Sequence, residues 1–279
     1  MSTYRLEIGE ITCIAIAEGG MDVDVSSIPQ RYPNATAEEV ADALDRLGIH
    51  GEKTANYFNA LYIESDGTKI LVDAGMGQNP ERPQVGQIVP NLASVGVQPE
   101  DIDIVYITHF HGDHYLGLLS NGQPTFPNAR YITLDTEWDF WMSEDAKTKM
   151  PERVQGIRNV VAPLSDKFST VSAGDEIATG IRTVLLAGHT MGQSGLLIES
   201  GDDSLLHLVD VLHSTAQFLY PDWHFVWDTD ANLAVETRHA QLTNASQQNS
   251  LVMFYHLPFP GLGHIQQVDE HYHWIPLEN

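Results

Sequence analysis

The chain has very few basic residues. Its 279 residues include 14 Lys and Arg against 38 Asp and Glu, which gives a formal net charge of −24 at pH 7. Most of the affinity of proteins for nucleic acids comes from Lys and Arg that displace counterions from phosphates. Anionic membrane surfaces repel a protein of the same sign. We therefore expect neither a nucleic acid nor a membrane as a partner, and a small neutral molecule as the substrate.

Long apolar runs, a recognisable leader and paired cysteines are also missing. The sequence contains no run of about 18 apolar residues, the length needed to cross a bilayer. Its first residues, MSTYRLEIGEITC, lack the basic segment, apolar stretch and cleavage site of a secretory signal. This predicts a cytoplasmic protein. Cys13 is the one cysteine, and its place in the run ITCIAIA predicts a buried core position.

Strand patterns occur in both halves of the chain, with helical patterns between them. Segment 19–34 shows neither the two-residue period of a strand nor the 3.6-residue period of a helix, and we expect it to be a long loop. Sheets in both halves with helices outside favour an α/β fold, namely an αββα sandwich of two mixed sheets, and periodicity alone also allows a doubly wound sheet. We expect strands at 4–8, 10–17, 57–64, 68–73, 102–107, 129–133, 182–187, 196–199, 205–209 and 251–255, and helices at 37–47, 136–143, 152–161 and 231–243.

The sequence HFHGDH, directly after the expected strand 102–107, concentrates potential metal ligands. It holds three histidines and one aspartate within six positions, and Gly112 gives the turn conformational freedom. Three further ligand-type residues each follow an apolar strand. Imidazole and carboxylate ligands suit zinc, with cobalt, manganese and iron as alternatives. The seven candidate ligands are His109, His111, Asp113, His114, His189, Asp210 and His256.

HFHGDH resembles the H-x-H-x-D-H signature of the metallo-β-lactamase-fold hydrolases. The tripeptide GHT around His189, then Asp210 and His256, follow in the order of that family, so the resemblance covers roughly residues 59–264. It implies that residues 1–279 form a single domain with the site at one edge of two sheets. It also implies that Asp73, in ILVDAG, lies behind the ligands.

The resemblance further implies two divalent metal ions per chain. One ion is held by His109, His111 and His189, the other by Asp113, His114 and His256, and Asp210 bridges the two. Two ions contribute +4, the two aspartates −2 and a bridging hydroxide −1, which leaves a local charge of +1. Such a centre keeps hydroxide at neutral pH, since metals lower the pKa of bound water toward about 7. We expect this hydroxide to attack a carbonyl or phosphoryl centre, with Asp113 moving a proton to the leaving alkoxide.

Several branches of the family differ from this sequence at particular residues. Flavodiiron proteins have glutamate in place of His111, and many true metallo-β-lactamases use a cysteine ligand and lack the bridging aspartate. Ribonuclease-type members need a basic surface. The segments DVLHSTAQF, PDW, WDTDANLAVETR and YHLPFPGLGHI instead resemble the branch of lactonases and organophosphate hydrolases.

We therefore expect a hydrolase in which metal-bound hydroxide opens a lactone ring, with the N-acyl-homoserine lactones of quorum quenching as candidates. Hydrolysis of organophosphate triesters of the methyl-parathion type is the alternative. A glyoxalase II-like thioesterase and a β-lactamase are weaker alternatives. By analogy with related lactonases, we expect a homodimer.

His213 stands in the place of a substrate-contacting tyrosine of the best-known lactonases. Two roles remain open for it, a catalytic contact with the substrate or support of a metal ligand. His264, after the PFPG turn, is expected to hydrogen-bond a ligand or the substrate, and Arg238 to be a buried ion-pair partner. We expect the substrate pocket to be lined by Trp138, Trp141, Met142, Phe218, Phe254 and Leu262.

Overall fold

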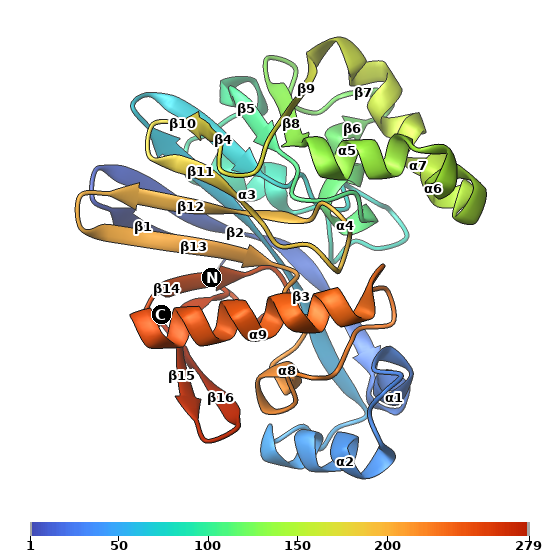
Figure 1. Cartoon of the computed structure of the whole chain (residues 1–279). Helices are drawn as coiled ribbons and strands as arrows, with labels where there is room; N and C mark the ends of the chain where they lie inside the picture. The colour runs from blue at the N-terminus through green and yellow to red at the C-terminus, as the bar shows by residue number, and fades with distance from the viewer. Residues whose placement is uncertain (1, 278–279) are drawn as a thin grey trace.

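The computed structural model describes residues 2–277, which form two large mixed β-sheets with helices on their outer faces (Figure 1). In the first sheet, β1 to β4 pair antiparallel and β4, β5, β8 and β9 pair parallel. In the second sheet, only β13 and β14 pair parallel among the described residues. The first sheet has the order β1 (Thr3–Ile8), β2 (Ile11–Asp24), β3 (Lys53–Ser65), β4 (Thr68–Val72), β5 (Ile104–Tyr106), β8 (Arg130–Leu134) and β9 (Phe168–Val171). The second has the order β10 (Glu176–Ala178), β11 (Ile181–Leu185), β12 (Ser194–Ser200), β13 (Asp203–Val209), β14 (Leu251–Phe254), β15 (Leu262–Val268) and β16 (His271–Pro276).

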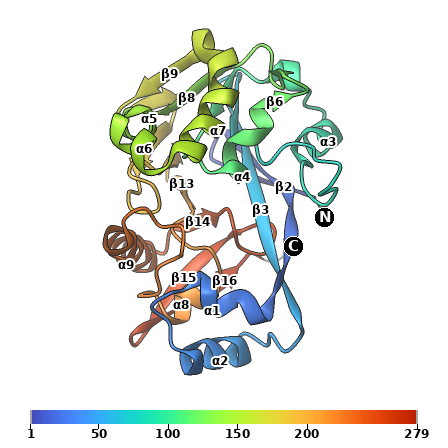
Figure 2. The same ribbon diagram turned by 90° about the vertical axis from the view of Figure 1, so that its right-hand side faces the viewer.

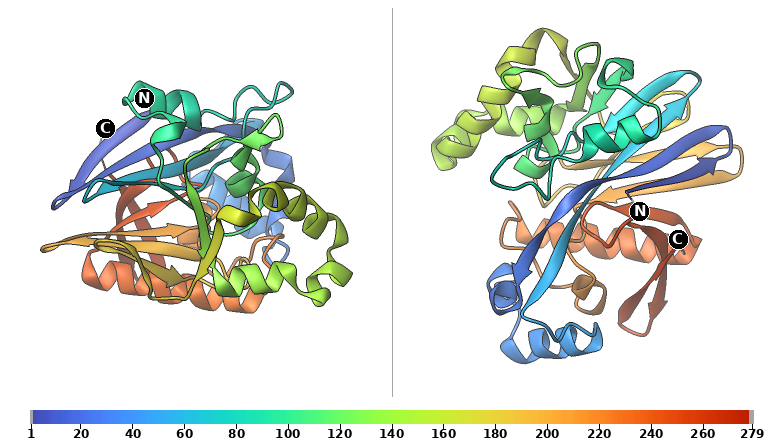
Figure 3. Two further views of the ribbon diagram at one scale, coloured as in Figure 1. Left: turned by 90° about the horizontal axis from the view of Figure 1, so that it is seen from above. Right: turned by 180° about the vertical axis from the view of Figure 1, so that it is seen from behind.

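The two sheets pack face to face, and helices cover their outer sides (Figure 3). Buried side chains of both sheets, among them Cys13, Leu61, Ile198 and Met253, form the layer between them. The outer face of the first sheet is covered by α3 (Ile88–Ser94), α5 (Asp135–Met142), α6 (Glu144–Lys149) and α7 (Pro151–Val161), and that of the second by α9 (Ala231–Gln248). This arrangement confirms the expected αββα sandwich.

Short elements complete the chain. They are α4 (Gly112–Tyr115), α8 (Ala216–Leu219), the small hairpin β6 (Leu119–Ser120) and β7 (Gln123–Pro124), and the 3₁₀ turns η1 (Val25–Ser27), η2 (Pro99–Asp101), η3 (Leu116–Leu118) and η4 (Ala162–Lys167). Within the described residues, no helix has both the length and the apolar character required to span a membrane.

The expectation of a loop over residues 19–34 is wrong. Strand β2 continues to Asp24 and pairs with β3 as far as Lys53, so this long hairpin extends beyond the sandwich (Figure 2). Its sequence, GGMDVD, has low strand propensity, but cross-strand pairing outweighs propensity here. The hairpin carries α1 (Ile28–Arg31) and α2 (Ala37–Arg46), and a capping box between Thr36 and Glu39 begins α2.

Candidate metal centre

The candidate ligands come together at one edge of the two sheets because each follows the end of a strand. Asp73 follows β4, the HFHGDH segment follows β5, and Asp210 follows β13. Val209, directly before Asp210, has φ 51°, a conformation that a β-branched residue rarely adopts. Such backbone strain costs about 1–3 kcal/mol and is found where function requires one side-chain direction. Here it accompanies the turn that brings Asp210 to the sheet edge.

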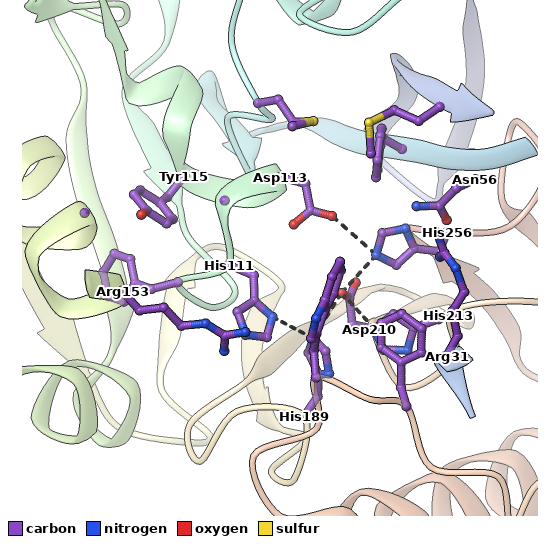
Figure 4. A pocket seen from close by; sticks show the side chains of 18 of the residues that line it. Arg31, Asn56, His111, Asp113, Tyr115, Arg153, His189, Asp210, His213 and His256 are labelled. Carbon is purple, nitrogen blue, oxygen red and sulfur yellow. Dashed lines mark hydrogen bonds and ion pairs between the residues drawn. The ribbon is translucent and has the colours of Figure 1, made fainter. Parts of the chain in front are cut away.

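All seven candidate ligands converge on one cluster. Figure 4 shows five of them, with Asp210 between His111, Asp113, His189 and His256. The Oδ2 atom of Asp210 is 3.0 Å from Nε2 of His256 and 3.3 Å from Nε2 of His114. Nε2 of His189 is 3.5 Å and Nε2 of His109 is 3.6 Å from the same oxygen. The groups whose ligand atoms lie within 4.8 Å of one another are His109, His111 and His189; His109, His114 and Asp210; Asp113, His114 and His256; and His189, Asp210 and His213.

The donor atoms fit a divalent metal. Within the described residues, the Nε2 atoms of His109 and His114 and the Oδ1 atom of Asp210 are buried and have no hydrogen-bond partner, and His111 turns its Nδ1 toward Nε2 of His189, 2.8 Å away. Buried polar atoms in proteins are normally satisfied, so several orphan atoms in one cluster indicate a site for a cation. Neutral imidazole nitrogen and carboxylate oxygen are ligands that zinc binds well.

Hydrogen bonds on the far side of the rings orient the histidines. Nδ1 of His114 is 2.8 Å from Oδ2 of Asp73, and Nδ1 of His189 is 2.8 Å from Oδ1 of Asp228. Nδ1 of His256 lies 3.0 Å from the carbonyl oxygen of Tyr57. A ring N–H donated to each acceptor leaves Nε2 with its lone pair directed into the cluster. Asp228 is not among the expected residues, although it belongs to the segment WDTDANLAVETR.

Glu137 connects two of the loops that carry ligands. Its Oε1 accepts hydrogen bonds from the amide of Phe110 (2.8 Å) and from Nε1 of Trp141 (2.7 Å). Its Oε2 accepts from Oγ1 of Thr190 (2.6 Å) and from the amide of Gly192 (3.1 Å). A single buried carboxylate therefore ties the HFHGDH loop to the loop of His189. Nothing in the sequence pattern distinguishes Glu137 from the other acidic residues of its helix.

Burial and neighbouring charges set the protonation of the cluster. Burial lowers the pKa of His109 and His111 well below the usual value, so both rings are neutral. Burial would raise the pKa of Asp210, but His256 and His114 outweigh it and hold that pKa well below its usual range. Burial also lowers the pKa of His213 to about 3. Burial would lower the pKa of His114 and His256 as well, but Asp210 and the other carboxylates beside them outweigh it and raise both values. A cation that binds here therefore takes the place of protons on these two rings.

His213 lies inside the cluster. Its Nε2 is 3.4 Å from Oδ2 of Asp210, and its ring stacks on Phe225 with centroids 3.9 Å apart. Both ring nitrogens are buried and have no hydrogen-bond partner among the described residues. The ring is therefore available to a substrate or to an ion.

Of two further residues singled out in the sequence, His264 lies away from the cluster and Arg238 lies where it was expected. Nδ1 of His264 is 3.2 Å from the carbonyl oxygen of Asn249, on the outer side of β15, so His264 contacts neither the cluster nor its cavity. Arg238 is buried, donates to the carbonyl oxygens of Val211, Pro221 and Trp223, and has its Nη2 4.0 Å from Asp228, as expected of an ion-pair partner.

The expected substrate pocket is wrong in all six positions. The six apolar side chains are close to the ligands in sequence, but strand and helix periodicity directs them into the core. The six residues Trp138, Trp141, Met142, Phe218, Phe254 and Leu262 pack in the hydrophobic core and line neither cavity beside the cluster.

Two cavities meet at the cluster instead. The larger, of about 490 Å³, is lined by five of the seven candidate ligands. The rest of its wall includes Met21, Phe58, Met76, Phe110, Phe225 and Trp227 together with Arg31, Arg82 and Arg153. The smaller, of about 270 Å³, is lined mainly by apolar side chains of α1, α2, α8 and the extended hairpin. Four residues line both cavities: Arg31, Asn56, His213 and His256.

Comparison with known proteins identifies the family to which the chain belongs. A sequence profile of the metallo-β-lactamase superfamily matches residues 55–256. The N-acyl homoserine lactonase of Bacillus cereus is 23% identical over 199 residues, which cover 63% of this chain and 74% of that protein. Exodeoxyribonuclease WalJ of Streptococcus pneumoniae is 38% identical over 60 residues, only 22% of this chain and 20% of that protein.

Two solved structures match the whole chain. AidC, a dizinc quorum-quenching lactonase in complex with the product N-hexanoyl-L-homoserine, superposes with a TM-score of 0.91 at 24% identity. AbOPH, a hydrolase of the β-lactamase superfamily, superposes with a TM-score of 0.89 at 28% identity. Each match covers 100% of this chain and 98% of the other.

The chain belongs to the metallo-β-lactamase superfamily. It is a metal-dependent hydrolase that resembles quorum-quenching lactonases and the hydrolase AbOPH.

Proposed function

We propose that the protein is a dinuclear lactonase, with N-acyl-homoserine lactones as the first substrates to test. The observation that carries the proposal is the cluster around Asp210, whose Oδ2 lies 3.0–3.6 Å from Nε2 of five histidines. The likeness to curated N-acyl homoserine lactonases over more than half of the chain supports a lactone as the substrate.

In this proposal, the two triads of ligands hold two ions, with zinc preferred. His109, His111 and His189 would hold one ion, Asp113, His114 and His256 would hold the other, and Asp210, which lies between the two triads, would be shared by both. Divalent ions at such a site lower the pKa of water toward about 7 and polarise a carbonyl oxygen, which is the chemistry that lactone hydrolysis needs. Water then adds to the lactone carbonyl, the acyl–oxygen bond breaks, and the alkoxide takes up a proton to give a hydroxy acid.

Two side chains of the cluster are assigned further roles. The side chain of Asp113 is 23% exposed whereas that of Asp210 is 2% exposed, so Asp113 is the ligand carboxylate that can reach a substrate. We assign to Asp113 the transfer of the proton to the alkoxide. His213 donates a ring N–H to the substrate oxygen, because its buried nitrogens have no other partner among the described residues.

The smaller cavity suits the acyl arm of such a lactone. Its wall includes Val23, Ile28, Val40, Leu44 and Leu47, and it opens beside His213 and His256. Apolar walls with a few convergent polar groups are typical of small-molecule sites. An aliphatic acyl chain would bury apolar surface there at about 25 cal/mol per Å².

The test is a parallel screen of the zinc-loaded protein. Acyl-homoserine lactones, aryl phosphotriesters, thioesters and cephalosporins are compared by kcat/KM. We expect the lactones to rank first, chelation to abolish turnover, and added Zn²⁺, Co²⁺ or Mn²⁺ to restore it. Asp210→Ala should lose several orders of magnitude in rate. Full activity of the metal-free protein would contradict the proposal.

A second candidate function, hydrolysis of organophosphate triesters, is favoured by the match to AbOPH. That structure is 28% identical over the whole chain, more than the 24% of AidC. A phosphoryl oxygen can take the place of the lactone carbonyl at the same cluster. Phosphotriesters ranking above all lactones in the screen would replace the first proposal with this one.

A further inference from the structure

Three arginines converge on the larger cavity although the chain is strongly acidic. Arg31 from α1, Arg82 from the segment between β4 and α3, and Arg153 from α7 all line it. The whole chain has only 14 Lys and Arg against 38 Asp and Glu. The net charge predicts neutral substrates, but it does not predict that three arginines converge on the site from three different elements.

These arginines are not neutralised by the protein. Within residues 2–277, none of the three has a carboxylate oxygen within 4.0 Å, whereas Arg5, Arg182 and others do. The acidic residues that line the cavity are Asp113, Asp210 and Glu152. The two aspartates belong to the candidate metal centre. Glu152 is adjacent to Arg153 on α7, and neighbouring residues of a helix do not face each other.

Arg31 occupies the most informative position. It is partly buried and lines both cavities, at the place where they meet beside His213 and His256. Burial lowers the pKa of its guanidinium, and no carboxylate is among the groups that offset this effect. A partly dehydrated cation without a counter-ion is costly. A ligand that supplies the negative charge would remove this cost.

Arg153 lies on the opposite side of the cluster from Arg31 (Figure 4). Its charge contributes to the lowered pKa of His111 and acts on Tyr115, so its guanidinium lies within electrostatic range of the metal ligands. The planar guanidinium group binds carboxylate or phosphate through two parallel hydrogen bonds. A substrate held at the cluster therefore has a cationic partner on either side.

We propose that Arg31, supported by Arg153 and Arg82, binds an oxyanion substituent of the substrate, a carboxylate or a phosphate ester. The inference rests on the proposed lactonase function and deepens it: the reacting ring is neutral, but the preferred lactone carries an anionic group. The negative charge of the outer surface does not prevent this, because salt screens it beyond about 8 Å under physiological conditions.

Matched substrates test the inference on the zinc-loaded protein. γ-Butyrolactone with a ring carboxylate is compared with its methyl ester, and a phosphorylated sugar lactone with its unphosphorylated form. We expect the anionic member of at least one pair to have the higher kcat/KM. Arg31→Gln should reduce that preference about tenfold to hundredfold, mainly through KM, and Arg31→Lys should retain part of it. Arg158→Gln is the matched control, because Arg158 lies on α7 and does not line the cavity.

Calorimetry gives a second readout that does not depend on turnover. The zinc-loaded protein should bind 2-hydroxyglutarate, the ring-opened dicarboxylate, more tightly than 4-hydroxybutyrate, and Arg31→Gln should remove the difference. Neutral members preferred in both pairs, or equal binding of the two acids, would overturn the inference and leave the lactonase proposal intact. If no lactone is hydrolysed, the lactonase proposal fails, and the calorimetry still decides whether Arg31 binds an oxyanion.

Discussion

Nδ1 of His114 lies 2.8 Å from Oδ2 of Asp73, and both side chains are fully buried. Asp73 also accepts hydrogen bonds from the amide and the hydroxyl of Thr108, the residue directly before the first candidate ligand. One carboxylate thus orients a ligand of the proposed second metal and fixes the start of the loop that carries the others. Asp73 is the first residue after β4, and its backbone has φ 64°.

Replacing Asp73 with Asn should therefore weaken the metal centre without removing a ligand. The amide cannot accept the His114 N–H and the Thr108 donors as the carboxylate does, so the ring loses its fixed direction. Loss of such an outer partner typically costs 10- to 100-fold in metal affinity. Competition with a zinc-binding dye measures the affinity. Asp66→Asn, in the exposed turn of the β3 and β4 hairpin, is the control and should bind zinc as the wild type does.

The sequence predicts which candidate ligands converge better than it predicts the surroundings of the cluster. Four of the candidate ligands stand in one motif, and the others follow the ends of strands. These strand ends meet at one edge of the two sheets and bring the ligands together. Asp73 could be placed only by resemblance. Glu137 could not be found, because three of its four donors are 27 to 55 residues away in the chain.

The pocket could not be predicted because its wall comes from distant segments. Arg31, Met76 and Arg153 meet only once the long hairpin, the segment after β4 and helix α7 are placed around the cluster. Trp141 is apolar and close in sequence to the motif, yet its ring faces the core and its Nε1 bonds Glu137. The hairpin itself depends on the pairing of Asp22 with Ala55 and of its neighbours, which local propensity does not reveal.

Glu137 provides a test of how the two ligand loops are joined. Gln in its place keeps one acceptor oxygen but directs an NH₂ group at two of the four donors. Leaving buried donors without an acceptor costs about 1–3 kcal/mol each. We expect Glu137→Gln to lower the free energy of unfolding by about 3 kcal/mol, measured by urea denaturation. Glu144→Gln, whose side chain is 83% exposed, should stay within about 0.5 kcal/mol of the wild type.

Cys13 should be chemically inert while the protein is folded. Burial raises the pKa of its thiol to about 12, and its side chain is fully buried between the sheets. The reactive species is the thiolate, which an unfolded chain forms from about pH 8.5. Since the folded pKa is the higher one, this group's contribution to stability is complete below about pH 8.5 and is lost as the pH rises toward 12.

A disulfide reagent at pH 8 measures this directly. We expect no labelling of the native protein within the time that labels the urea-unfolded protein completely. Cys13→Ser serves as the blank. Between pH 8.5 and 10, the wild type should lose stability relative to that variant by about 1.4 kcal/mol per pH unit. Rapid labelling of the folded protein would show that the thiol is accessible and contradict the prediction.

Replacing His213 tests whether its side chain contacts the substrate or binds a metal ion. The proposed centre already has seven ligands, and two ions must also hold water and the substrate. If His213 donates a hydrogen bond to the substrate oxygen, His213→Ala removes about 2–4 kcal/mol of transition-state stabilisation in a dry site. The rate should then fall about 30- to 1,000-fold while the metal content stays unchanged.

Three measurements separate the possible results for His213. The first is the metal content by plasma emission spectroscopy, and the second is kcat with an acyl lactone. The third is the recovery of rate in His213→Gln, which keeps an N–H donor. His50→Ala, at an exposed position, is the control. Loss of one metal in His213→Ala would make His213 a ligand, since its Nε2 lies 3.4 Å from Asp210 and groups with His189. An unchanged rate and an unchanged metal content would mean that the ring only fills space against Phe225, and the proposed substrate contact would be wrong.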